Sequence, residues 1–158
     1  MIISFTGHRP IKLGGYKLPN TIKDKIQSYL VEIIGKLQPD KAISGMALGV
    51  DQWAAETCIN LSLPFVAAVP FIGQDQVWPP ESQIIYRQLS AQACEKVIVC
   101  EGGYSAEKMQ IRNEWLVDIC DILLAVFNQS ETSGGTFNCI SYASSIDKKI
   151  IIIDPSLL

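Results

Sequence analysis

Long apolar runs and a surplus of basic residues are both missing from this chain of 158 residues. No stretch approaches the roughly 20 apolar residues that a membrane-spanning helix needs, so we expect no membrane association. The strand-like start at Ile2 has no basic segment before it, which argues against a signal peptide. The 13 Lys and Arg residues against 16 Asp and Glu residues give a net charge of −3. This balance argues against a protein dedicated to binding the nucleic-acid backbone, which usually carries a basic surplus.

Clusters of metal or disulfide ligands are missing too. His8 is the only histidine, and no Cys-x-x-Cys pair occurs among the five cysteines, which are Cys58, Cys94, Cys100, Cys120 and Cys139. Scattered thiols in an odd number are typical of small core residues in a reducing compartment, not of a disulfide framework or a zinc site. The sequence therefore predicts a cytoplasmic protein without a metal centre.

Three motifs of common enzyme classes are also absent. No Gly-x-Gly-x-x-Gly follows the first strand, which argues against a standard NAD enzyme. The chain has no Gly-x-x-x-x-Gly-Lys-Ser/Thr run either, which argues against a P-loop nucleotidase. The Gly-x-Ser-x-Gly motif of many serine hydrolases is likewise missing.

Short apolar runs alternate with amphipathic segments along the whole chain. The runs predict strands over 2–5, 41–43, 64–69, 96–99, 122–127 and 150–153, with helices between them. No repeat, linker or low-complexity tract interrupts the alternation, so we predict one domain over residues 1–158. Its fold class is α/β: a Rossmann-like, doubly wound, mostly parallel sheet of about six strands with helices on both faces. Right-handed crossovers with one change of winding direction predict the strand order 3-2-1-4-5-6.

The stretch Ser44-Gly45-Met46-Ala47-Leu48-Gly49-Val50-Asp51 is the most informative part of the chain. It joins a short buried strand to a helix with an apolar stripe. Gly45 and Gly49 permit a positive φ and let a ligand approach the main chain. Because the first N–H groups of a helix lack partners and its dipole favours an anion, this turn is a candidate phosphate seat. The alternative is a tight strand-to-helix turn that binds nothing.

A second turn of small residues, Ser133-Gly134-Gly135-Thr136, opens a later helix. Its N–H groups and the Thr136 hydroxyl could hold phosphate oxygens, and a simple helix cap is the alternative. In a parallel α/β sheet, ligands bind at the carboxyl ends of the strands. Both turns, the segment Gly7-His8-Arg9 after the first strand and the loop around Arg112 belong to that edge. We therefore predict that they form one site.

Arg112 is predicted to face the sheet, where a guanidinium needs an anionic partner or a path along which its charged end reaches water. The partner is either a ligand phosphate or an internal carboxylate, Asp51 or Asp118. Asp51 itself either stabilises the dipole of its helix or accepts a hydrogen bond from a ribose hydroxyl or from Arg112. Trp78 is a candidate for stacking on a base, with core packing as its alternative.

These residues together resemble the SLOG superfamily, which joins the DNA-processing protein A (Smf) family to the LOG (Lonely Guy) phosphoribohydrolases. The small bacterial and phage members called YspA/YpsA-like are the most similar in size and in motifs. The SGxAxGxD motif of the first family is matched in full, and its shorter motifs are matched by Gly7 and Arg9, Arg112 and Asn113, and Ser133 and Gly134. The LOG motif PGGxGTxxE is matched only in part, because Cys139 stands where its catalytic glutamate should be. A thiol there is expected to be buried and protonated.

The resemblance implies a domain that binds a nucleotide or a nucleotide-derived molecule. We predict binding or sensing of such a ligand without catalysis and without a further cofactor. The candidate ligand-binding residues are Gly7, His8, Arg9, Ser44, Gly45, Gly49, Asp51, Trp78, Arg112, Asn113, Ser133, Gly134, Gly135 and Thr136.

Two alternative functions stay open at this stage. One is an N-glycosidic nucleotide hydrolase, which would need Asp51 or Glu114 as its carboxylate beside the ribose. The other is nucleic-acid binding related to DNA processing, which the acidic balance disfavours. The sequence also leaves open whether the chain forms a homodimer or a larger homo-oligomer.

Overall fold

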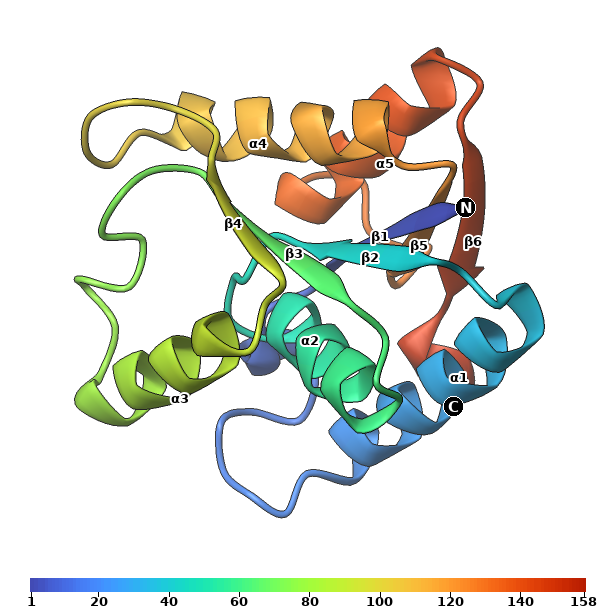
Figure 1. Cartoon of the computed structure of the whole chain (residues 1–158). Helices are drawn as coiled ribbons and strands as arrows, with labels where there is room; N and C mark the ends of the chain where they lie inside the picture. The colour runs from blue at the N-terminus through green and yellow to red at the C-terminus, as the bar shows by residue number, and fades with distance from the viewer.

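A computed structural model describes residues 1–158 as one six-stranded sheet between two layers of helices (Figure 1). The strands are β1 (Ile2–Gly7), β2 (Lys41–Ser44), β3 (Phe65–Val69), β4 (Glu95–Ile98), β5 (Ile122–Val126) and β6 (Lys149–Ile153). The α-helices are α1 (Thr21–Leu37), α2 (Val50–Asn60), α3 (Pro80–Ala91), α4 (Ala106–Ile119) and α5 (Gly135–Ser145). Two short 3-10 helices, η1 (Pro10–Lys12) and η2 (Pro155–Leu157), complete the elements. None of the helices combines the length and the apolar composition that a membrane span requires.

The predicted α/β, Rossmann-like class is confirmed, because every pair of neighbouring strands is parallel. The observed order is β4-β3-β2-β1-β5-β6. The predicted neighbours 3-2-1 and 5-6 are present, but β4 pairs with β3 at the sheet edge instead of lying beside β1. The winding direction therefore reverses one strand later than predicted. Exposed Glu95 and Lys96 fit this position, because charged side chains protect edge strands from further pairing.

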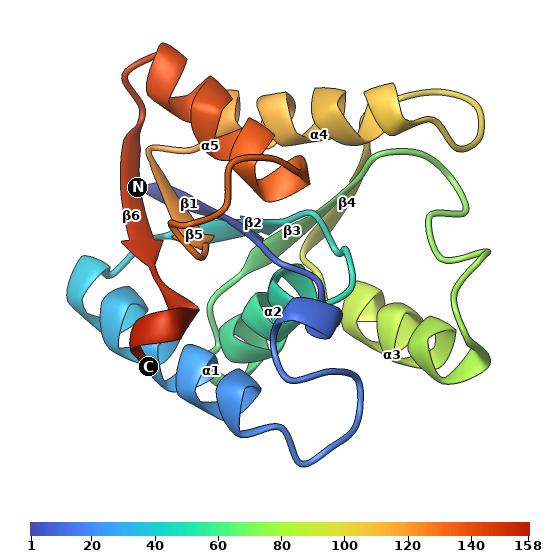
Figure 2. The ribbon, with the colours of Figure 1, turned by 180° about the vertical axis from the view of Figure 1, so that it is seen from behind.

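The two faces of the sheet carry separate hydrophobic cores. Helices α1, α2 and α3 cover one face and α4 and α5 cover the other, as the two opposite views show (Figures 1 and 2). The larger core lies under α1–α3 and includes Phe5, Ile26, Leu30, Trp53, Phe65 and Tyr86. The smaller core lies under α4 and α5 and includes Leu116, Val117, Cys120, Leu123, Cys139 and Ala143. Of the five free cysteines, Cys58, Cys120 and Cys139 are buried as predicted. The prediction is wrong for Cys94, which is exposed in the connection between α3 and β4, and Cys100 is only partly buried.

The switch point of the sheet lies between β1 and β5. Gly7, the last residue of β1, is in register with Val126, the last residue of β5. The chain leaves β1 towards the face of α1–α3 and leaves β5 towards the face of α4 and α5 (Figure 2). The two loops diverge from the same edge, and this divergence creates the crevice in which sheets of this type bind ligands.

We expect Gly49→Ala to destabilise the fold by about 3 kcal/mol, since both a strained backbone and a steric overlap would result. Gly49 has a φ of 95°, and a Cβ atom there would lie 2.5 Å from the carbonyl oxygen of His8. The matched control is Gly35→Ala, because Gly35 is inside α1 and a Cβ atom there meets no atom within 4 Å. The control should stabilise the protein by about 0.5–1 kcal/mol. Urea unfolding of both variants measures the difference, and a neutral Gly49→Ala would contradict the role given to this glycine.

Candidate functional site

A pocket of about 530 Å³ opens at the carboxyl edge of the sheet, at the switch point between β1 and β5. Its walls come from the end of β1, the turn before α2, the start of α4 and the turn before α5. The predicted residues that line it are Gly7, His8, Arg9, Asp51, Arg112, Asn113, Ser133, Gly134, Gly135 and Thr136. The structure thus brings four segments together as the sequence predicted. Their role in binding a ligand stays a prediction.

The remaining predicted residues, Ser44, Gly45, Gly49 and Trp78, do not line this pocket. Ser44 is fully buried, where its Oγ accepts a hydrogen bond from the Met46 N–H at 3.1 Å and donates one to the Asp51 carbonyl at 2.7 Å. The first N–H of α2, that of Val50, donates to the His8 carbonyl at 3.4 Å. The chain itself therefore occupies the N-terminus of α2. This arrangement favours the interpretation of the turn as a tight strand-to-helix connection.

The two glycines of the turn act in different ways. The predicted positive φ is confirmed at Gly49 and is wrong at Gly45, because the residue after it, Met46, takes the positive φ instead. At Gly45 the constraint is space, since a Cβ atom would lie 2.5 Å from Arg112 Nη1 and 2.7 Å from Asp51 Oδ2. Gly45 thus allows a buried arginine and a buried carboxylate to approach the main chain.

Arg112 is 3% exposed and lies at the floor of the pocket. Its Nη1 donates to the carbonyl oxygens of Gly45 and, at 3.1 Å, of Ala68, and its Nε donates to Asn113 Oδ1 at 3.0 Å. Burial lowers the pKa of Arg112 and the nearby Asp51 opposes that change. Asp118, the other predicted partner, accepts instead from the Tyr142 hydroxyl. Nη2 forms no hydrogen bond with the protein, which leaves this corner of the guanidinium free of protein partners.

Asp51 is buried in the first turn of α2 and lines the same pocket. Burial raises the pKa of this carboxyl, while Arg112 and the Ala47 N–H, which donates to Oδ2 at 3.3 Å, act against the rise. The floor of the pocket therefore places one cation near one carboxylate, although the two groups form no direct ion pair. Glu114, the second carboxylate considered for a hydrolase, does not line the pocket.

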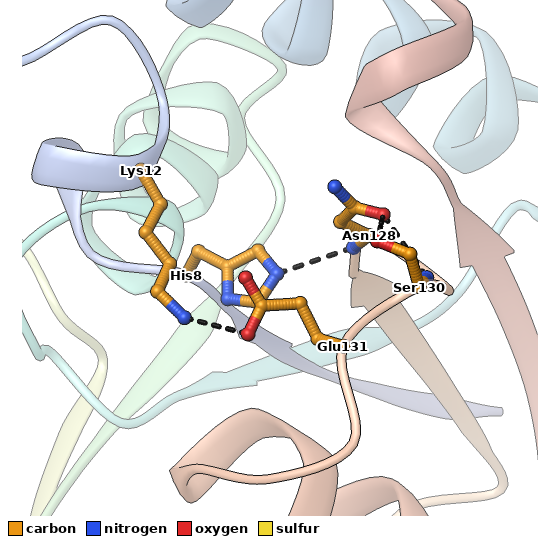
Figure 3. A network of polar contacts seen from close by, with 5 residues as sticks. All are labelled: His8, Lys12, Asn128, Ser130 and Glu131. Atoms are coloured by element: carbon orange, nitrogen blue, oxygen red, sulfur yellow. Dashed lines mark hydrogen bonds and ion pairs between the residues drawn. The ribbon is translucent and has the colours of Figure 1, made fainter.

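His8 lies on the wall formed by the end of β1 (Figure 3). The backbone N–H of Asn128 donates to His8 Nε2 at 3.1 Å, and the ring packs against Phe127 with centroids 5.4 Å apart. Because a backbone amide can only donate, Nε2 must be unprotonated and the neutral ring carries its proton on Nδ1. Burial lowers the pKa of His8 from its ordinary value of 6.5, and the positive charge of Lys12 lowers it further.

The N-terminus of α5 is open, in contrast to that of α2. Gly134 is its N-cap residue, no side chain caps the helix, and its first turn contains no acidic residue. Gly134, Gly135 and Thr136 line the pocket, so their unpaired N–H groups lie beside it. The helix dipole adds a partial positive charge at this end.

Trp78 is packed edge-on against Tyr86, with ring centroids 5.4 Å apart, and is partly buried against the larger core. The structure thus favours core packing over base stacking for this residue. Tyr104 is the aromatic residue that does reach the pocket, from the exposed loop before α4.

Several pocket residues were missed by the sequence reasoning. They are Thr6, Ile11, Lys12, Ala47, Ala106, Met109, Gln110 and Asn138. Lys12 is the charged member of this set and forms an ion pair with Glu131 at 2.8 Å. Its place in the segment directly after Gly7-His8-Arg9 could have indicated it. The expectation for Cys139 is confirmed: the thiol is fully buried and burial raises its pKa to about 12.

Comparisons with known proteins agree with this architecture. The model of the YspA SLOG family matches residues 3–157. The chain is 33% identical over 139 residues to the uncharacterized SPbeta prophage-derived protein YoqJ of Bacillus subtilis, covering 77% of this chain and 80% of YoqJ.

Two solved structures share the fold. One is DNA processing protein A from Helicobacter pylori, which is described for its single-stranded DNA binding mode. Its TM-score is 0.67 at 17% sequence identity, and the match covers 98% of this chain and 65% of that protein. The other is DNA processing protein A from Streptococcus pneumoniae, with a TM-score of 0.67 at 13% sequence identity. That match covers 96% of this chain and 50% of the Streptococcus protein. The chain therefore spans about two thirds and one half of these proteins, and the likeness concerns the fold.

We expect the pKa of His8 to lie below 6.5 in the folded protein, because its ring is buried and faces Lys12. Since His8 is the only histidine, its ring resonances in an NMR titration give this value without assignment variants. Lys12→Met should raise the pKa and Glu131→Gln should lower it, in line with the charge each variant removes. The neutral form is stabilised by folding, so this contribution to stability is full above pH 6.5 and is lost as the pH falls through the lowered pKa. A pKa above 6.5 would contradict the assigned hydrogen bond to Nε2.

Proposed function

The chain belongs to the YspA SLOG family, and on that premise we propose that its pocket binds a phosphorylated nucleotide or a nucleotide-derived ligand. The observation that carries the proposal is that the open N-terminus of α5 and the free corner of Arg112 line one pocket. Both are donors suited to phosphate oxygens, one through backbone N–H groups and the other through a charged guanidinium. The pocket volume of about 530 Å³ is in the usual range for small-molecule sites.

The ligand is proposed to lie across the switch point. Its phosphate contacts the N–H groups of Gly135 and Thr136 and the Thr136 hydroxyl. Arg112 supports the phosphate from the pocket floor, and the Asp51 carboxylate accepts a hydrogen bond from a ribose hydroxyl. The exposed Tyr104 is the aromatic surface available to a base.

Nucleic acid is a second candidate ligand, because the Helicobacter pylori protein of the same fold is described as binding single-stranded DNA. A nucleic acid offers the same phosphate chemistry to the pocket. The net charge of −3 gives this chain no general basic surface, which favours a small ligand. A single-stranded oligonucleotide therefore belongs in the binding test beside the mononucleotides.

The binding proposal predicts that Gly135→Val loses ligand affinity while keeping the fold. Gly135 lines the pocket, and a Cβ atom there meets no protein atom within 4 Å, so the new side chain would enter the space meant for phosphate. We expect at least a tenfold loss, or about 1.4 kcal/mol, for a nucleotide that raises the melting temperature of the wild type. Gly103→Val is the matched control, because Gly103 has equally open surroundings but does not line the pocket.

Calorimetry with nucleotides, the matching nucleosides and a single-stranded oligonucleotide measures these affinities. Nucleosides should bind more weakly than nucleotides to the wild type and should lose less in Gly135→Val. If Gly135→Val and Gly103→Val bind every nucleotide with equal affinity, no phosphate lies at the turn before α5. Binding of the oligonucleotide alone would assign the pocket to nucleic acid.

We expect no appreciable release of free base from nucleoside monophosphates over hours at micromolar protein. N-glycosidic cleavage needs a carboxylate beside a developing positive charge, and Cys139, at the position of the LOG glutamate, is a buried, protonated thiol. Loss of general acid–base help alone typically removes about 10²–10⁴ in rate. Chromatography of base and ribose phosphate measures the outcome, with Asp51→Asn as the control. Multiple turnovers that disappear in Asp51→Asn would establish the hydrolase instead.

A further inference from the structure

An ion pair joins the two walls of the pocket at its rim. Lys12 in η1 donates from Nζ to Glu131 Oε2 at 2.8 Å, and Glu131 lies in the loop between β5 and α5 (Figure 3). The two residues are 119 positions apart in the sequence and meet because β1 and β5 are neighbours in the sheet. Lys12 lines the pocket, and Glu131 is only two residues before Ser133, which also lines it. The pair therefore lies close to the α5 turn, on which the proposed ligand would bind.

The backbone of Glu131 is held in place by the turn that carries it. The Asn128 N–H donates to His8 Nε2 at 3.1 Å, which ties the turn to the end of β1. Asn128 Oδ1 accepts hydrogen bonds from the backbone and the hydroxyl of Ser130, and the Asn128 carbonyl accepts from the Glu131 N–H at 3.0 Å (Figure 3). The side chain of Glu131 has no bonding partner other than Lys12, so the pair can open without a change in this turn.

Lys12 differs from the other cations of the pocket. Arg9, Lys12 and Arg112 all line it, and of these three only Lys12 forms an ion pair. Both members of the pair are partly exposed, and such pairs are weak because water competes for each charge. A phosphate group carries more negative charge than a carboxylate and makes stronger charge-assisted hydrogen bonds. A ligand phosphate at the rim can therefore replace the Glu131 carboxylate as the partner of the Lys12 ammonium group.

We propose that Glu131 is a specificity-determining residue, which occupies Lys12 in the free protein and yields it only to a ligand with a second phosphate group at the rim. This inference rests on the proposed function and names its ligand class as nucleotides that carry at least two phosphates. The first phosphate lies on the N–H groups of α5, with Arg112 at the floor. The second lies at the rim on Lys12, which is attached to the opposite wall. A nucleoside monophosphate fills the first position and leaves the Lys12–Glu131 pair closed.

The test compares nucleoside mono- and diphosphates of each base by calorimetry on the wild type, Glu131→Gln, Lys12→Met and the double variant. Glu131→Gln should bind diphosphates about twofold to fivefold more tightly, the range expected for removing a competing exposed ion pair, and monophosphates with unchanged affinity. Lys12→Met should bind diphosphates about tenfold more weakly. In the Lys12→Met background, Glu131→Gln should bring no further gain.

Glu32→Gln is the matched control, because it removes the same charge from another surface ion pair, that with Lys36 on α1. It should leave every affinity unchanged. The inference would be overturned if Glu131→Gln gained the same affinity for mono- and diphosphates, or if the gain persisted in the Lys12→Met background. No gain in affinity at all would overturn it too. If nucleotides bind and none of these differences is seen, the proposed function stands and this inference alone fails. If no nucleotide binds to the wild type or to Glu131→Gln, both fail.

Discussion

The burial of one guanidinium constrains the whole carboxyl edge of the sheet. Arg112 has almost no contact with solvent, and an unpartnered buried cation is strongly destabilising. The carbonyl oxygens of Gly45 and Ala68 and the nearby carboxylate of Asp51 satisfy it. Gly45 follows β2, Ala68 lies in β3 and Asp51 lies in the first turn of α2. Three separate parts of the chain must therefore converge on one side chain from α4. The absence of a side chain at Gly45 follows from the same constraint, because a Cβ atom would overlap the guanidinium.

The two strand-to-helix turns with glycines show how similar motifs take different roles. Both α2 and α5 begin after a glycine with positive φ, at the same edge of the sheet. The start of α2 is covered by the segment that follows β1, in which the His8 carbonyl accepts the first N–H of the helix, and Asp51 already supplies a negative charge there. The start of α5 has neither a covering segment nor an acid in its first turn. Packing against a neighbour, not the glycine pattern itself, decides which helix end is free for an anion.

Local sequence patterns predicted most of the fold. The features that they did not predict depend on contacts between residues far apart in the sequence. Apolar periodicity located all six strands, and the rule that ligands bind at carboxyl ends brought the segments of Gly7, Arg112 and Gly134 to one pocket. The place of β4 depends on which partner strand is available, although Glu95 and Lys96 could have indicated an edge. The Lys12–Glu131 pair could not be predicted, because two flexible side chains 119 residues apart leave no periodic signal. The packing of Trp78 on Tyr86 likewise depends on how an irregular loop folds back.

The charges at the pocket floor support the proposal of ligand binding over the alternative of glycosidic cleavage. Cleavage of that bond develops a positive charge on the sugar, which a free carboxylate must stabilise. Asp51 is the carboxylate at the floor, but its charge is already offset by Arg112 and by the Ala47 N–H. Arg112 beside it would disfavour a second cation at the same place. A neutral ribose hydroxyl, in contrast, can donate to Asp51 without disturbing this balance, and a phosphate can accept from the free corner of Arg112. In the proposed function, the two opposed charges of the floor would thus meet the two ends of a ribose phosphate.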